Sequence, residues 1–198
     1  MKSGLNFTDD WFSHNIPIWK LVLDKFKPKK LLEIGSYEGR SACWLIQELG
    51  IQYDFGLTCI DNWFGPTEST RSLEERFDNN IQICLNEVNT QVSFRKISSN
   101  SFEGLSKLIQ ENASFDFIYI DGCHSAPDVL CDMVLSWHLL EHKGIMICDD
   151  YLWKFEKFGG HDFLNRPKLA IDSFTSIFNH RLEILSAPTN QQTYIQKN

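Results

Sequence analysis

The 198-residue sequence lacks the features that mark several large classes of protein. It contains no run of lysine and arginine, and its net charge is −7, which argues against a nucleic-acid partner. No apolar stretch approaches the roughly 18 residues that span a bilayer, and residues 1–6 carry no signal-peptide-like hydrophobic segment. We therefore expect a cytoplasmic protein with no membrane span.

Cysteine is present, but in no metal-binding or disulfide pattern. The six cysteines include no Cys-x-x-Cys pair, and several fall in segments predicted to be strands or helices. This usage is typical of reduced, buried thiols. Hydrophobic residues make up 42% of the chain, so it can bury a sizeable core. We expect residues 1–198 to form a single domain.

Apolar, strand-like segments alternate with helical segments along the chain. This alternation predicts parallel strand pairing with right-handed crossovers. The expected fold is α/β and doubly wound (Rossmann-like), with a mostly parallel seven-stranded sheet, helices on both faces and a C-terminal antiparallel hairpin. The predicted strands are residues 30–34, 56–60, 92–97, 115–120, 144–148, 181–186 and 193–196.

Two segments outside this alternation are expected to cover a binding site. Residues 1–28 are predicted to form an N-terminal helical cap, with a helix over residues 9–27 that ends at Pro28. Residues 151–166 carry six ring-bearing side chains, a heavy apolar load for a surface loop, and contain Gly159-Gly160 as a hinge. We interpret this second segment as a candidate lid that excludes water.

The turn after the first predicted strand carries the most informative pattern. Glu33-x-Gly35-x-x-x-Gly39 ends a strand and opens a helix, so backbone N–H groups there face a ligand. Dinucleotide loops place a second glycine two residues after the first, where this chain has Tyr37. A ligand with an amine, a carboxylate and a sulfonium fits this turn better than a dinucleotide. Ser36, which follows Gly35, would lie next to that ligand. The alternative is a turn that needs glycine only for its backbone angles.

Asp61 ends the next predicted strand, where an acid is placed to accept ribose hydroxyls. Asn62 and Trp63 follow directly and would cover an adenosine or form the pocket wall. Nicotinamide cofactors contain the same ribose, so Asp61 alone leaves both cofactor classes open. A simple loop carboxylate is the remaining alternative.

Each of the five predicted parallel strands ends in a polar residue. In open α/β sheets, ligands bind at the carboxyl ends of the strands. We expect these polar ends to form one pocket. They are Glu33, Asp61, Ser98 with Ser99, Asp121, and Asp149 with Asp150.

Asp121, Asp149 and Asp150 end two strands that are expected to be neighbours, about 4.8 Å apart. Their carboxylates can share one cation, and an all-oxygen set favours Mg²⁺, Ca²⁺ or Mn²⁺ over zinc. Adjacent side chains of a strand point to opposite faces, so Asp149 and Asp150 converge only where the chain turns. The alternative is that one or two of these acids cap a helix or face solvent.

His124 lies three residues after Asp121, just before a predicted helix. The positive end of the helix dipole disfavours protonation, which leaves a neutral imidazole suited to act as a general base. We therefore name His124 and Asp121 as candidate catalytic residues. The alternative for His124 is local packing or capping.

Glu33, Gly35 and Gly39 resemble the first motif of class I S-adenosylmethionine-dependent methyltransferases. Residues 121–124 and 149–151 resemble a subgroup that includes macrolide- and aminocoumarin-sugar O-methyltransferases and cephalosporin-hydroxylase-like proteins. The resemblance implies S-adenosylmethionine as the cofactor. It also implies that Asp121 contacts this cofactor.

In the sugar methyltransferases of this subgroup, acids that match Asp121, Asp149 and Asp150 hold Mg²⁺. Some members have a catalytic aspartate at the position of Cys123, where this chain departs from the pattern.

The sequence thus predicts an O-methyltransferase that acts on a small-molecule, sugar or glycan hydroxyl, with Mg²⁺ as an optional aid. The apolar first helix is compatible with a homo-oligomer. A nicotinamide-dependent oxidoreductase and a non-catalytic binding module are the alternatives. An iron-dependent hydroxylase would need two histidines and one carboxylate, and no suitable histidine pair lies at the strand ends.

Overall fold

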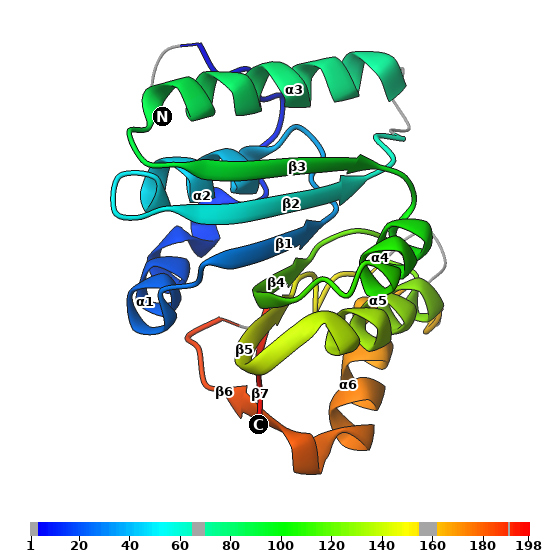
Figure 1. The fold of residues 1–198 in the computed structure, drawn as a ribbon. Coiled ribbons are helices and arrows are strands. Elements are labelled where there is room, and N and C mark those ends of the chain that lie inside the picture. Colours follow the sequence, from blue (N-terminus) through cyan, green and yellow to red (C-terminus); the bar gives the residue numbers. More distant parts are fainter. Residues whose placement is uncertain (1–3, 65–69, 155–161, 190) are drawn as a thin grey trace.

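The computed structural model describes residues 4–64, 70–154, 162–189 and 191–198 (Figure 1). The strands are β1 Lys30–Ile34, β2 Phe55–Asp61, β3 Val92–Ser98, β4 Phe115–Ile120, β5 Leu140–Cys148, β6 Leu182–Leu185 and β7 Thr193–Lys197. The helices are α1 Ile16–Phe26, α2 Arg40–Leu49, α3 Thr70–Glu87, α4 Ser101–Gln110, α5 Ala126–Leu139 and α6 Pro167–Ile177, with short 3₁₀ turns η1 Ser13–Asn15 and η3 Asn179–Arg181.

In this described part of the chain, seven strands form one sheet in the order β3-β2-β1-β4-β5-β7-β6. The first five strands pair in parallel, and β7 runs antiparallel to both β5 and β6. Helices lie on both faces of the sheet (Figure 1). The predicted fold class is confirmed, including the C-terminal antiparallel pair and the adjacency of the fourth and fifth strands.

The sheet separates two hydrophobic layers. Successive side chains of a strand point to opposite faces, so Leu31 packs in the layer under α1, α2 and α3, whereas Leu32 packs in the layer under α4, α5 and α6. Phe117 and Ile118 of β4 divide in the same way. Burial on both faces explains why these strands are continuous apolar runs.

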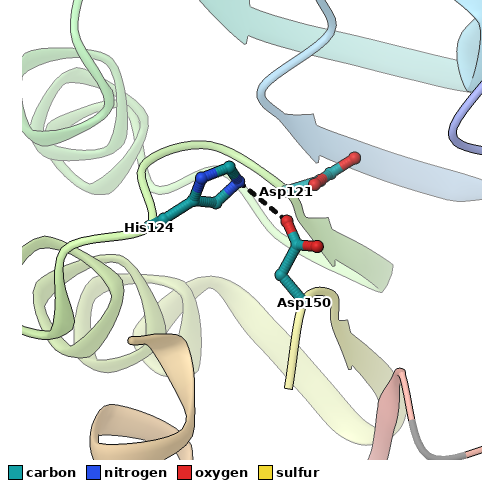
Figure 2. Close-up of side chains that lie close together, drawn as sticks. All are labelled: Asp121, His124 and Asp150. Atoms are coloured by element: carbon teal, nitrogen blue, oxygen red, sulfur yellow. Dashed lines mark ion pairs between the residues drawn. The ribbon is translucent and has the colours of Figure 1, made fainter. Parts of the chain in front are cut away.

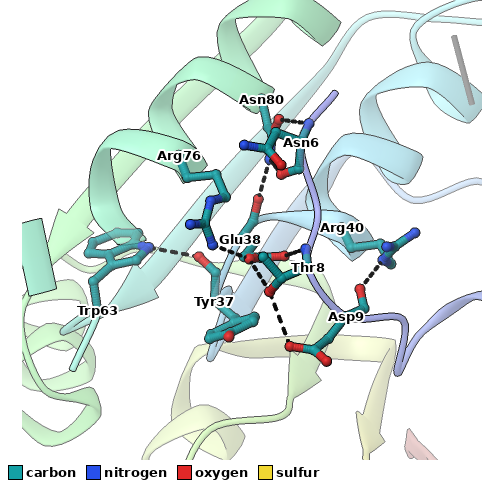
Figure 3. A network of polar contacts seen from close by, with 9 residues as sticks. All are labelled: Asn6, Thr8, Asp9, Tyr37, Glu38, Arg40, Trp63, Arg76 and Asn80. Carbon is teal, nitrogen blue, oxygen red and sulfur yellow. Dashed lines mark hydrogen bonds and ion pairs between the residues drawn. The ribbon is translucent and has the colours of Figure 1, made fainter. Parts of the chain in front are cut away.

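The N-terminal residues differ from the predicted helix over 9–27, because α1 begins only at Ile16. Residues 4–12 form neither helix nor strand and cross the first strand-to-helix turn (Figure 3). We call them the N-terminal strap. Glu38 anchors the strap by accepting hydrogen bonds from the backbone N–H and hydroxyl of Thr8, both at 2.7 Å, and it also pairs with Arg76 of α3. A buried carboxylate far away in sequence thus sets the path of the strap.

The predicted lid over 151–166 lies largely outside the described residues, since 155–161 are not described. Only its ends, 151–154 and 162–166, are part of the fold given above. Among the helices within the described ranges, none is both long enough and apolar enough to cross a membrane.

Candidate active site

A cavity of about 1120 Å³ opens at the carboxyl ends of the parallel strands. Its walls combine residues from the ends of all five parallel strands, as the polar termini predicted. From the predicted set they include Gly35, Ser36, Tyr37, Asp61, Asn62, Ser99, Asp121, His124, Asp149 and Asp150. Four other predicted cofactor residues do not line the cavity. They are Glu33, Gly39, Trp63 and Ser98.

Glu33 supports the first turn from behind. It is 1% exposed and accepts hydrogen bonds from the hydroxyl of Ser36, at 2.6 Å, and from the hydroxyl of Ser41. Burial raises the pKa of Glu33, and these hydrogen bonds oppose the shift. In this arrangement Glu33 anchors the turn.

Gly35 brings two turns into contact. Its φ of +84° is in the left-handed region, and an added Cβ would lie 2.0 Å from the carbonyl oxygen of Asp121. The turn after β1 therefore packs directly on the turn after β4, at a distance that only glycine permits. Gly39, also at positive φ, would place its Cβ 2.9 Å from the Phe77 ring, so its role is in packing at the start of α2.

Asp61 ties the ends of β1 and β2 together. Its Oδ2 accepts the backbone N–H groups of Ser36, at 2.7 Å, and Tyr37, at 2.8 Å, and its Oδ1 accepts the N–H of Trp63, at 2.6 Å. The indole of Trp63 is fully buried and donates to the carbonyl of Tyr37 (Figure 3). Trp63 thus packs behind the turn, and the neighbouring Phe64 lines the cavity.

Asp121, His124 and Asp150 form a cluster in which one ligand atom from each lies within 4.8 Å of the others (Figure 2). Nε2 of His124 is 2.8 Å from Oδ2 of Asp150. Asp150 has a φ of 58°, so the chain turns directly after β5, and Asp150 meets His124 at this turn. We call these three residues the acid–histidine cluster.

Asp149 faces a different set of partners from the one predicted. Its Oδ2 accepts a hydrogen bond from the amide of Gln192, at 2.7 Å, and contacts the hydroxyl of Tyr119, which also lies 2.9 Å from Asp121. The structure thus brings together one imidazole and two carboxylates, where the sequence predicted three carboxylates. Gln192 carries no signal in the sequence, because only the pairing of β7 with β5 brings it to this site.

The acids at this end of the cavity destabilise one another. Burial raises the pKa of Asp121, and the nearby carboxylates of Asp149 and Asp150 raise it further. Burial likewise raises the pKa of Asp149. A bound cation would offset this repulsion, so the cluster has the electrostatic character of a cation site.

Two further features of the cavity wall bear on chemistry. The strap contributes Trp11, whose ring centroid lies 5.2 Å from that of Tyr37. The sequence predicted that residues 1–28 cover the site, but as a helical cap, whereas Trp11 reaches the cavity from the non-helical strap. Cys123 is an exposed residue whose thiol contacts the carboxylate of Asp128. Partial desolvation of the sulfur and the charge of Asp128 raise the pKa of the thiol, which disfavours a nucleophilic thiolate.

Comparisons with known proteins agree on the fold. Residues 32–151, more than half of the chain, match a family model described as a methyltransferase domain. No curated protein matches the sequence. Among solved structures, a candidate O-methyltransferase from Klebsiella pneumoniae aligns with a TM-score of 0.69 at 18% identity, over 97% of this chain and 83% of that one.

Two other structures were solved with ligands. The O-methyltransferase TomG from Streptomyces achromogenes, in complex with S-adenosylmethionine, has a TM-score of 0.67 at 17% identity, over 96% of this chain and 82% of its own. The mycinamycin-pathway methyltransferase MycE, in complex with Mg and S-adenosylhomocysteine, has a TM-score of 0.59 at 15% identity. The alignment covers 96% of this chain and 51% of MycE. Because the family model covers more than half of the sequence and the fold agrees, this chain belongs to the methyltransferase-domain family.

Proposed function

We propose that the chain transfers a methyl group from S-adenosylmethionine to a hydroxyl oxygen of a small-molecule or sugar acceptor. The observation that carries this proposal is that the Asp61 turn and the acid–histidine cluster face the same cavity. One end has the character of a nucleoside site, and the other offers a base and carboxylates. The ligands in TomG and MycE support the choice of donor.

The donor would bind at the ends of β1 and β2. Asp61 is the candidate acceptor for the ribose hydroxyls, and the turn at Gly35 and Ser36 offers polar groups to the amino-acid part. Asn62 and Ser99 line the same end and can complete the contacts to the nucleoside. A pyrophosphate would meet Tyr37 where dinucleotide sites have a glycine, so a nicotinamide cofactor fits poorly.

The acid–histidine cluster fits a divalent cation with a preference for oxygen ligands. Asp121 and Asp150 would hold it, with His124 beside them, and their carboxylates suit Mg²⁺ or Mn²⁺. When bound, such a cation would lower the pKa of the acceptor hydroxyl and orient it. The described cluster has one histidine, so it lacks the two-histidine set of an iron-dependent hydroxylase.

His124 is the candidate general base. With its Nε2 paired to Asp150, its Nδ1 is the nitrogen that remains to accept a proton. The hydroxyl oxygen would attack the methyl carbon as that carbon's bond to sulfur breaks, so the sulfonium becomes a thioether and the hydroxyl proton passes to His124. The cavity contributes by holding the two reactants in line.

Calorimetric titration tests the donor assignment without knowledge of the acceptor. S-adenosylhomocysteine should bind with one site per chain, and NADH should not bind. Substitution of Asp61 by Asn should weaken the binding of S-adenosylhomocysteine. Binding of NADH in preference to S-adenosylhomocysteine would overturn the proposal.

Catalysis needs a separate measurement, because a binding module could retain the donor pocket. Labelled methyl transfer from S-adenosylmethionine to candidate hydroxyl acceptors should depend on His124. An acceptor that is methylated equally well by the His124→Gln variant would exclude this residue as the base.

A further inference from the structure

The N-terminal strap forms part of the cavity wall beside the turn after β1. Glu38, which is 1% exposed, fixes the strap through Thr8 and is itself paired with Arg76 (Figure 3). This anchoring carries Asp9, Asp10 and Trp11 to the cavity. The chemistry of these side chains therefore bears directly on what the cavity accepts.

The described lining is strongly acidic. It contains eight carboxylates and one guanidinium, that of Arg40. Arg40 is already engaged, because it donates to the carbonyl of Asp9 at 2.8 Å, lies 3.5 Å from the carboxylate of Asp10, and covers the ring of Phe7 at 4.4 Å. Glu38 is already paired with Arg76. The other seven carboxylates still outnumber the positive charges of Arg40, a divalent cation and a donor of net charge +1. The field in the cavity thus opposes an anionic acceptor.

The mouth of the cavity is aromatic as well. Trp11, Phe64 and Phe102 all line the cavity and are 65%, 78% and 59% exposed. Large exposed rings in the wall of one cavity offer a binding surface to an apolar, planar group. Trp153 adds a ring next to His124, with centroids 4.1 Å apart.

We infer that the acceptor carries no phosphate and presents a planar apolar portion to the rings at the mouth, with selection against anions by the acids of the strap. This inference rests on the proposed function and narrows it. Coenzyme A thioesters, nucleotide sugars and other phosphate esters are excluded as acceptors. Neutral or cationic phenols and glycosides with an aromatic part remain.

A matched pair of fluorescent probes tests this inference. 4-Methylumbelliferyl glucoside is neutral, whereas 4-methylumbelliferyl phosphate presents the same ring with a dianion. Both are titrated into the protein loaded with S-adenosylhomocysteine and Mg²⁺, and binding is followed by energy transfer from tryptophan. We expect the glucoside to bind at least about ten-fold more tightly at low ionic strength, and added salt to narrow the difference.

Three variants assign the effect to residues. Asp10→Asn removes one acid and releases Arg40 from its ion pair, so the preference for the glucoside should fall several-fold. Trp11→Ala should weaken both probes to a similar extent. Glu183→Gln, which removes a charge on β6 away from the cavity, should change neither.

Equal or tighter binding of the phosphate ester would overturn the inference. Failure of both probes to bind would contradict the aromatic mouth as a ring-binding surface. Loading with S-adenosylhomocysteine is measured first in the same samples. Its failure would count against the proposed function, and its success with a reversed probe preference would count only against the acceptor class.

Discussion

Carboxylates at the two ends of the cavity are in opposite conditions. At the ends of β1 and β2, Asp61 accepts three backbone N–H groups, and Glu33 accepts two serine hydroxyls. At the ends of β4 and β5, Asp121 and Asp149 contact the same tyrosine hydroxyl, and Asp150 pairs with His124. The carboxylates at the ends of β1 and β2 accept hydrogen bonds from donors that the fold supplies. The carboxylates at the ends of β4 and β5 lie close to one another.

This difference separates two uses of the same residue type. A carboxylate surrounded by donors holds the backbone around it in place, which organises the donor pocket before any ligand arrives. A group of half-buried carboxylates with few donors keeps negative charge that a cation or a proton must offset. We expect changes at the first end to affect donor affinity and the turn, and changes at the second to affect cation binding and catalysis.

The largest effect should follow from breaking the acid end alone. Replacing His124 by Gln removes the proposed base, and the rate of methyl transfer should fall by about 10²–10⁴-fold. The affinity for S-adenosylhomocysteine should stay within about two-fold, because the residue lies outside the Asp61 turn. His138→Gln, on the exposed side of α5, is the matched control. If the affinity for S-adenosylhomocysteine fell by the same factor as the rate, the claim that the two ends of the cavity have separate roles would be contradicted.

Gly35→Ala should break both ends together. The added methyl group would lie 2.0 Å from the carbonyl of Asp121, at a φ of +84°. Left-handed strain and the steric clash should lower the free energy of unfolding by about 2–5 kcal/mol. Chemical denaturation measures this loss. Gly56→Ala is the control, because its Cβ would meet nothing closer than 3.7 Å. Equal stability of the two variants would contradict the close packing of the turns.

Asp132 is a third kind of carboxylate, buried outside the cavity lining and with few hydrogen-bond donors. It is 1% exposed, its Oδ2 has no hydrogen-bond partner in the described structure, and burial raises its pKa from 3.8 to about 6. The folded chain therefore keeps a proton that the unfolded chain loses. The stabilisation is present below about pH 4 and is lost as the pH rises through 6, which costs about 2–3 kcal/mol between pH 4 and pH 8.

The measurement for Asp132 is a difference between two proteins, because other buried acids also titrate. The free energy of unfolding is measured from pH 4 to pH 8 for the native chain and for Asp132→Asn. The native chain should lose about 2–3 kcal/mol more than the variant over this range. Parallel curves for the two proteins would show that the Asp132 carboxyl has an ordinary pKa.

The smallest of these effects belongs to the donor end. Asp61→Asn leaves one carbonyl oxygen to accept hydrogen bonds but removes the charge that serves three N–H groups and the proposed ribose contact. A loss of about 1.5–3 kcal/mol is expected, which is roughly a ten- to hundred-fold weaker affinity for S-adenosylhomocysteine by calorimetry. Asp54→Asn, on the segment before β2, should leave the affinity unchanged.

Much of the fold could be predicted because its signals are local. Alternating apolar strands and helices, together with a terminal strand pair, were sufficient for the sheet and its two covered faces. The first helix was predicted to start seven residues too early, at residue 9, because the strap is held by distant partners. Glu38 and Arg76 fix Thr8 across the fold, and no helical pattern reports such contacts.

The site could be predicted at the level of strand ends and less well at the level of side-chain direction. Polar termini identified Asp61 and Asp121 because parallel strands end at one edge of the sheet. Whether Asp149 or His124 joins Asp121 depends on the turn at Asp150 and on Gln192, which reaches Asp149 through the antiparallel pairing of β7. These are tertiary features that strand alternation alone does not specify.

Diffraction from crystals grown with S-adenosylhomocysteine and Mn²⁺ tests the shared cavity most directly, because the anomalous signal of manganese locates the cation independently of the protein atoms. We predict one manganese peak between the carboxylates of Asp121 and Asp150. We also predict that the ribose of S-adenosylhomocysteine contacts Asp61. The account would be contradicted if S-adenosylhomocysteine bound elsewhere or if no manganese peak appeared. It would also be contradicted if Asp149 held the manganese ion in place of Asp150.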